Sequence, residues 1–557
     1  MNFKPGSIAD ISIDFEAVLG YSGQQLLMDS LTSEISIKPP PFFKAARAGS
    51  AIGVSTIAAL ISGFLLQLAI AYKFGASGST DAYFMAQGTS ELLAKILLGG
   101  SITSVFLPIF VEYLTGGQQD RAWKLANNLF NVSAIIFTIA LVILELFINP
   151  IVSFIAPGFS AETHHVTVEI LRVMLPAFFF TMLLDLGASM LNSLRIFGLP
   201  AAARLISPLL SFFLVVFLSD RYGIIVLAFG ALIGGLLQLT LILWALYREG
   251  VPYRPTLSFT DPDLIRVLVL VSPFILSILA AQGAGIIYRI LVSHFPEGSL
   301  SALKFGDKIA QMTNSLFLAN IVVVSFPAFS RAVATGLESE IVKTTKQAFR
   351  LMVFFGIPLT IGIVLLRTNV IRLLYERGSF TAIDTGMTSA VLGILLLGLL
   401  ANGLSSLLGH LALAMKVTRV SVIVTIITQI LTSALFYLLA PQLGVKGLAL
   451  GSAISPFILT TLYAIWLSKR VPRLWTIFAD ISLYKILISG IALFAGTYFG
   501  RQIFGGITHG ITNDIVTIIG STAFGLTAYL FSAYALRVPE FSMIKEIMYY
   551  AIKRKKS

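Results

Sequence analysis

Long apolar runs follow one another along almost the whole chain, and they constrain its fold more than any other feature. A helix needs about 20 mostly apolar residues to cross a bilayer, and about fourteen runs reach that length. The strands of a membrane β-barrel alternate in polarity over about 10 residues, so these longer and more uniform runs predict helices. Their centres lie near Ala59, Leu97, Phe137, Phe180, Phe212, Leu236, Leu279, Leu316, Ile361, Leu399, Thr428, Leu459, Leu493 and Phe524.

Charged residues are too few for a soluble protein of this size. They make up 12% of the 557 residues, whereas a soluble domain carries about 25%. The sequence therefore predicts an all-α polytopic membrane protein with about 14 transmembrane helices. It contains no cysteine and five histidines without paired spacing, and it lacks a Gly-Lys-Ser/Thr phosphate-binding loop. We therefore expect a transporter rather than an enzyme, with no cofactor and no metal.

Basic residues set the expected orientation. With the N-terminus placed inside, the inner loops hold roughly three times as many Lys and Arg residues as the outer loops, as the positive-inside rule requires. The net charge of +12 then reflects topology and contact with anionic lipid, and not nucleic-acid binding. We expect residues 1–46 to form a polar cytoplasmic extension without a signal peptide, and residues 538–557 to form a basic cytoplasmic tail. Both termini are therefore expected in the cytoplasm.

Corresponding residues recur with an offset near 220, which indicates an internal duplication. Six spans in each repeat give both repeats the same orientation, so we expect two six-helix lobes related by a pseudo-twofold axis along the membrane normal. We place the N-lobe at residues 47–250, the C-lobe at residues 260–470 and two further spans within residues 480–537. The matched pairs include Asn149 and Asn369, Ile151 and Ile371, and Gly158 and Gly378.

Five short motifs occur between residues 48 and 540. They are Phe74-Gly75-Ala76 with Thr80-Asp81-Ala82-Tyr83-Phe84; Ala156-Pro157-Gly158-Phe159; Phe295-Pro296-Glu297-Gly298-Ser299; Leu373-Leu374-Tyr375-Glu376-Arg377-Gly378-Ser379-Phe380-Thr381; and Leu443-Gly444-Val445 with Gly447-Leu448-Ala449. Together they resemble the motifs of the lipid II flippases (MurJ/MviN), which belong to the multidrug/oligosaccharidyl-lipid/polysaccharide exporter superfamily. The resemblance implies the same fourteen-helix, two-lobed architecture that the span lengths predict independently.

The resemblance also implies a function. A flippase of this family would carry a polyprenyl-diphosphate-linked saccharide, with lipid II as the first candidate, from the inner to the outer leaflet of the bacterial inner membrane by alternating access. The expected partners are this glycolipid, membrane lipid, and enzymes of cell-wall or polysaccharide synthesis. Three alternatives stay open below it: export of another lipid-linked oligosaccharide such as an exopolysaccharide or O-antigen unit, cation-coupled drug export, and a membrane glycosyltransferase.

The chain departs from the family pattern where that pattern has arginines. An arginine pair with an aspartate is usual in the first span, but this chain has Ser62, Leu66 and Gln67 at those positions. The second span usually carries two adjacent arginines and a later glutamate, but this chain has Ala94-Lys95 and Gly99 there. The resemblance then leaves Lys95, Arg289 and Lys308 as the cations of a central cavity. Arginine binds a diphosphate with two parallel hydrogen bonds, whereas lysine acts as a point charge.

Charged residues inside a membrane are costly, so each is a candidate for function. Lys95 follows Glu91 by four residues on one helical face, which predicts either a cavity cation held by an ion pair or a structural pair between helices. Arg289 lies near the outer end of its span, where it would meet the head group or snorkel to the interface. Adjacent helical residues point about 100° apart, so we expect Lys308 to face the substrate and Asp307 to tune a neighbour.

Three further polar residues complete the candidate substrate site. Asp81 is expected to cap the second span or to pair with a cation at the outer gate. Asp185 is isolated in the fourth span, where it would bind substrate or form a hydrogen bond to a neighbouring helix. Gln67 would line a polar cavity or join two helices.

Overall fold

The computed structural model describes residues 42–98, 101–507 and 510–541. The chain falls into two compact units, Met1–Gly53 and Val54–Ser557. In the first unit, the described residues, 42–53, are helical. Most of the expected polar extension and of the expected basic tail lies outside the described residues.

Every regular element in the described part of the chain is a helix. The elements that correspond to the expected N-lobe are α3 (Phe42–Phe74), α4 (Gly78–Leu98), α5 (Ser101–Thr115), α6 (Gln119–Leu146), α7 (Ile148–Ile155), α8 (Ala161–Ser193), α9 (Gly198–Ala203), α10 (Ile206–Tyr222), the short 3₁₀ helix η1 (Gly223–Ile225) and α11 (Val226–Arg248).

The remaining elements form the expected C-lobe and the two final spans. They are α12 (Pro262–Val292), α13 (Ser299–Thr313), the π-helical turn η2 (Asn314–Leu318), α14 (Ala319–Ala334), α15 (Glu338–Tyr375), α16 (Ala382–Leu397), α17 (Leu399–Ala414), α18 (Thr418–Leu443), α19 (Val445–Ser468), the 3₁₀ helix η3 (Pro472–Ile477), α20 (Ile481–Phe504) and α21 (Gly510–Ala535).

Eleven segments among the described residues are long and apolar enough to cross a membrane. The expected count of about fourteen is compatible with this number. α10 and α11 fall within one of the eleven segments, and α5 and α12 contribute the shorter apolar helices Val105–Thr115 and Gln282–Val292. The all-α polytopic membrane fold expected from the apolar runs is therefore confirmed.

Local chemistry explains where several helices begin. The Ser160 side chain accepts a hydrogen bond from the first turn of α8, and Asp261 does the same for α12, which has Pro262 at its first position. Thr381 and Asp384 form a reciprocal capping box at the start of α16. Such caps satisfy backbone N–H groups that have no partner inside the helix.

The same helix pairings recur in the two halves of the chain. In the first half α4 packs on α8, α8 on α11, and α10 on α11. In the second half α13 packs on α16, α16 and α17 on α19, and α18 on α19. The recurrence follows the sequence offset near 220, as a duplicated six-helix unit requires.

Helix α12 packs on both halves. Its first part, with Leu264 and Val267, joins the apolar core formed by α5, α6, α8 and α11, whereas Ala284 and Val292 join the core that contains the second half. The lobe boundary that we draw between residues 250 and 260 stays a prediction.

The connection between the two halves is bound along α6. In this connection, residues 249–261, the Ser258 N–H donates to the Asn128 side chain, and the Asn128 amide donates back to the Ser258 carbonyl, both at 2.8 Å. Asp263 then accepts two hydrogen bonds of 2.8 Å from Arg121 of α6. The first turn of α12 is thereby fixed to the N-lobe.

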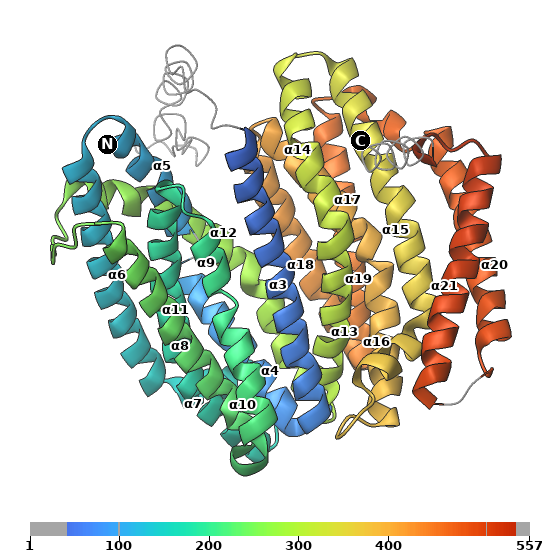
Figure 1. Cartoon of the computed structure of the whole chain (residues 1–557), viewed down its shortest axis with the longest axis horizontal. Coiled ribbons are helices and arrows are strands. Elements are labelled where there is room, and N and C mark those ends of the chain that lie inside the picture. The colour runs from blue at the N-terminus through green and yellow to red at the C-terminus, as the bar shows by residue number, and fades with distance from the viewer. Residues whose placement is uncertain (1–41, 99–100, 508–509, 542–557) are drawn as a thin grey trace, which may run out of the picture. The chain divides into compact units, whose positions relative to one another are not determined.

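Helices α20 and α21 form a hairpin beside α15, drawn in red in Figure 1. Polar contacts fix this hairpin to α15 at three levels. Asn369 of α15 donates to Asp514 at 2.6 Å, the Tyr529 hydroxyl donates to an α15 backbone carbonyl at 2.8 Å, and Arg350 pairs with Glu540, which follows α21, at 2.8 Å. The hairpin is therefore attached to the second half along its length.

Candidate functional site

Four of the five sequence motifs meet where α3 ends and α4 begins, the lower end of the helices in Figure 1. We call this region, around Gly75, Gly158, Gly298 and Gly378, the motif end. The Ser379 N–H donates to the Tyr72 carbonyl at 2.8 Å, so the fourth motif lies on the first. A side chain at Gly75 would place its Cβ 2.4 Å from the Ser379 carbonyl oxygen, which explains the glycine there.

Asp81 holds the two halves together at the motif end. It is 3% exposed, and it accepts hydrogen bonds from the N–H groups of Gly298 at 2.8 Å and Ser301 at 2.7 Å, and from the Ser301 hydroxyl. Asp81 therefore caps α13 in the C-lobe and not its own helix α4, which corrects the expectation of a cap on the second span. A carboxylate at a helix N-terminus is also favoured by the helix dipole.

Glu297 makes the reverse contact, from the C-lobe to the N-lobe. Its carboxylate accepts hydrogen bonds from Thr163 at 2.9 Å and from Ser160 at 3.3 Å, at the start of α8. It also lies against Gly78, where a Cβ would be 2.5 Å from a Glu297 oxygen. Sequence reasoning recognised the motif of Glu297 but did not single out the residue. At the motif end, Asp81 of the N-lobe therefore contacts the C-lobe, and Glu297 of the C-lobe contacts the N-lobe.

Arg289 joins α12 to α4. Its Nη1 donates to the Gly285 carbonyl at 2.8 Å within α12, and its Nη2 donates to the Gly88 carbonyl of α4 at 2.7 Å. A Cβ at Gly88 would lie 3.1 Å from Nη2 and 3.3 Å from Nε. A side chain at residue 88 would therefore require the guanidinium to shift by a few tenths of an ångström.

Lys308 also reaches the N-lobe. A Cβ at Gly63 of α3 would lie 3.3 Å from the Lys308 Nζ. The neighbouring Asp307 accepts a hydrogen bond of 2.6 Å from Gln311, one turn later on α13. Gln67 of α3 donates to the Lys304 carbonyl of α13 at 3.1 Å. This hydrogen bond links α3, which carries Gly63, to α13, which carries Lys308.

Glu91 and Lys95 do not form the ion pair that their spacing predicts. No nitrogen–oxygen distance within 4.0 Å joins them in this described part of α4, and Glu91 accepts instead from Gln87 at 3.1 Å. Lys95 is exposed, one turn farther from the motif end. Glu91 follows Gly88, the residue that Arg289 contacts, by three positions on α4, so it is an acidic residue close in sequence to the contact point of Arg289.

Asp185 is paired rather than isolated. Its carboxylate lies 3.1 Å from Arg204, at the end of α9. The two residues are separated by 19 positions and by the turn that leads into α9. The pair links α8 to the short helix that follows it, which supports the structural reading of Asp185.

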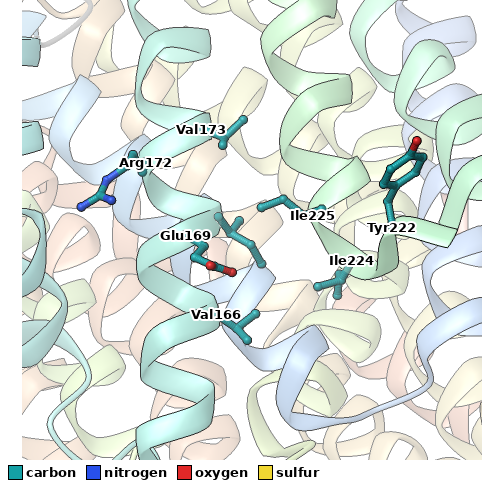
Figure 2. A pocket seen from close by; sticks show the side chains of 8 residues that line it. Val166, Glu169, Arg172, Val173, Tyr222, Ile224 and Ile225 are labelled. Atoms are coloured by element: carbon teal, nitrogen blue, oxygen red, sulfur yellow. The ribbon is translucent and has the colours of Figure 1, made fainter.

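A pocket of about 470 Å³ lies between α8 and the turn from α10 to α11, and Arg289, Lys308 and Lys95 are not among its lining residues. Figure 2 shows Glu169 and Arg172 on α8 and Tyr222 on the opposite wall, with Arg172 extending away from Tyr222. Arg172 pairs with Glu145 at 3.5 Å. The cation that lines this pocket, Arg172, is therefore paired with a carboxylate. The pocket is separate from the contacts of Arg289 with Gly88 and of Lys308 with Gly63.

Comparisons with known proteins agree with the motifs. A family described as lipid II flippase MurJ matches residues 70–509. A probable lipid II flippase MurJ of Buchnera aphidicola subsp. Acyrthosiphon pisum is 26% identical over 411 residues, 73% of this chain and 80% of the relative. That of Bdellovibrio bacteriovorus is 24% identical over 511 residues, 90% of this chain and 97% of the relative.

Solved structures share the fold. A lipid II flippase MurJ in an inward closed conformation has a TM-score of 0.74 and 24% identity, and the match covers 87% of this chain and 98% of that one. An inward-facing multidrug MATE transporter of the MOP superfamily has a TM-score of 0.65 and 16% identity, with 76% and 96% covered. The match to the MurJ family spans most of the chain, from residue 70 to residue 509, and the chain therefore belongs to the lipid II flippase MurJ family.

Proposed function

We propose that this protein moves lipid II, a polyprenyl-diphosphate-linked saccharide, from the inner to the outer leaflet of the bacterial inner membrane. The observation that carries the proposal is the position of two C-lobe cations against N-lobe glycines. Arg289 reaches Gly88, and Lys308 lies beside Gly63. A diphosphate entering between the lobes would meet both cations, and membership of the MurJ family supports the same cargo.

The physical problem is to carry a charged, sugar-bearing head through about 30 Å of hydrocarbon. Charge-assisted hydrogen bonds to phosphate oxygens are about twice as strong as neutral ones, and arginine can make two in parallel. Arg289 supplies such a fork, and Lys308 supplies a compact charge. Lys95, exposed on α4, is proposed as a first contact for the incoming head, with Glu91 as the acid that keeps the cations from repelling one another.

Transport then needs alternating access between the lobes. Asp81 and Glu297 close the motif end, which faces outward if the N-terminus lies in the cytoplasm as the basic residues indicate. Release of the cargo requires these contacts to break while the opposite end closes. Each negative charge that leaves an inside-negative cell gains about 2.3 kcal/mol per 100 mV, so no nucleotide is needed to drive the step.

The test is complementation of a bacterium depleted of its own lipid II flippase. Rescue by the wild-type chain and loss of rescue by Arg289→Ala, at equal membrane levels, are expected. Arg289→Lys should rescue in part, because the charge stays and the fork is lost. Full rescue by Arg289→Ala would remove Arg289 from the cargo site.

A second cargo class is favoured by one observation. Ser62, Leu66 and Gln67 occupy the first-span positions where the family pattern has an arginine pair and an aspartate, so the diphosphate meets fewer arginines here. Export of another polyprenyl-diphosphate oligosaccharide, such as an exopolysaccharide unit, is therefore the alternative. Failure of a well-expressed wild-type chain to rescue, together with transport of such a glycolipid in vesicles, would decide for it.

A further inference from the structure

The Arg289 guanidinium binds two helices at once. Its Nη1 donates to Gly285 of its own helix, and its Nη2 donates to Gly88 of α4 in the N-lobe. A backbone carbonyl is a neutral acceptor, and a phosphate oxygen is a charged one that makes a stronger hydrogen bond. The same two nitrogens that hold the lobes together are therefore those that a diphosphate would compete for.

Gly88 leaves room for this contact without a shift of the guanidinium. Glycine weakens the interior of a helix compared with alanine, so a glycine ten residues into α4 calls for a reason in packing. That reason is the close approach of Arg289: a Cβ at residue 88 would lie 3.1 Å from Nη2, tighter than the side chains can accept without moving. Gly283, only two residues from Gly285 in α12, has nothing within 4 Å of its Cβ position.

We propose that Arg289 is a cargo-responsive tie between α4 and α12, and that Gly88 is the positioning residue that seats it. The inference rests on the proposed function, because it assigns a diphosphate to Arg289. When two phosphate oxygens engage the fork, the guanidinium turns away from the Gly88 carbonyl and the lobes lose one of the contacts that hold the motif end closed. Opening is then favoured with cargo bound and disfavoured without it.

The Glu91 charge fits this role. It lies on α4 three positions after Gly88, the residue that Arg289 contacts. No Glu91 ion pair within 4.0 Å occurs among the described residues, and its carboxylate accepts a hydrogen bond from Gln87. Glu91 thus attracts the guanidinium toward α4 without holding it in a direct bond. Incoming phosphate oxygens do not have to break an ion pair before Arg289 can move.

The chain contains no cysteine, so spin labels can be attached to two introduced cysteines without other changes. Glu162 of α8 and Ile383 of α16 are exposed and begin helices at the motif end, one in each lobe. Their separation, measured by double electron–electron resonance in nanodiscs, reports opening of that end. The variants are Gly88→Ala and Arg289→Lys, and Gly283→Ala is the matched control.

Without cargo, we expect Gly88→Ala and Arg289→Lys to raise the ratio of the longer to the shorter distance about tenfold, the worth of one hydrogen bond from a charged group. Gly283→Ala should match wild type. Purified lipid II should raise the same ratio in wild type and have little further effect in Gly88→Ala. A wild-type ratio in both Gly88→Ala and Arg289→Lys would overturn the tie.

Lipid II affinity, measured in parallel on the same proteins, separates this inference from the proposed function. A weaker affinity of Arg289→Lys with an unchanged distance ratio would leave the cargo site in place and overturn the tie. If Arg289→Lys kept the wild-type affinity for lipid II but changed the distance ratio tenfold, Arg289 would hold the helices together without responding to cargo. That result would also overturn the proposal. Equal expression and monodispersity of all variants are required throughout.

Discussion

Replacing Asp81 by alanine should open the motif end. Asp81 accepts hydrogen bonds from the N–H groups of Gly298 and Ser301 in the other lobe, at 2.8 and 2.7 Å. Both N–H groups would be left buried without an acceptor in the closed state, at a cost of about 1–3 kcal/mol each. Water can satisfy them once that end opens, so the cost falls on the closed state alone.

A total of about 3 kcal/mol corresponds to a change of about 100-fold in the ratio of open to closed molecules. The distance between spin labels at residues 162 and 383 measures that ratio directly. Transport should fall as well, because an end that stays open breaks alternating access. Asp81→Asn should have a smaller effect, since the amide oxygen can still accept.

Asp220→Ala is the matched control. Asp220 pairs with Lys73 at 2.8 Å, but its side chain is 79% exposed, and exposed pairs contribute only about 0–1 kcal/mol. In Asp220→Ala, the distance between the labels at residues 162 and 383 should stay that of the wild type. A wild-type distance distribution in Asp81→Ala would refute the reasoning that the contact of Asp81 with the other lobe keeps this end closed.

Three further outcomes are expected. A reporter inserted within residues 336–345 should read cytoplasmic, because basic residues gather on that side. Asn128→Ala should speed proteolysis at Ser258 several-fold, since it removes two hydrogen bonds worth about 1 kcal/mol each. Arg121 holds the pKa of Asp263 below its usual range by hydrogen bonding, so this carboxylate stabilises the fold above its unfolded pKa of about 3.9 and loses that effect as pH falls through the lower folded value. The melting temperature of Asp263→Asn should therefore lie below wild type at pH 7 and approach it in acid.

The span pattern could be predicted from sequence because it depends on local apolar length alone. Fourteen apolar runs imply the helices, and the offset near 220 anticipates the pairings that recur in the two halves. What length cannot reveal is where a span is broken. Gly398 separates α16 from α17, and residues 314–318 form a π-helical turn between α13 and α14. Both features depend on the packing of neighbouring helices.

Site residues were harder to predict because their partners are distant in the chain. Asp81 caps a helix about 220 residues away, and local sequence patterns show only caps on the helix that follows. The spacing of Glu91 and Lys95 predicts an ion pair, but Gln87 lies one turn earlier on the same face and donates to Glu91 instead. Gly88 carried a readable signal, since an isolated glycine within a helix often marks a close approach.

The hairpin of α20 and α21 makes the duplicated architecture unequal. Three polar contacts at different levels fix it to α15, so any tilting of the second half must drag the hairpin through the surrounding lipid. The first half has no such appendage among its described helices. If the lobes rock as proposed, the second half therefore moves less relative to the surrounding lipid, and the first half makes most of the movement. The two halves of the duplication then differ in mobility although they share one fold.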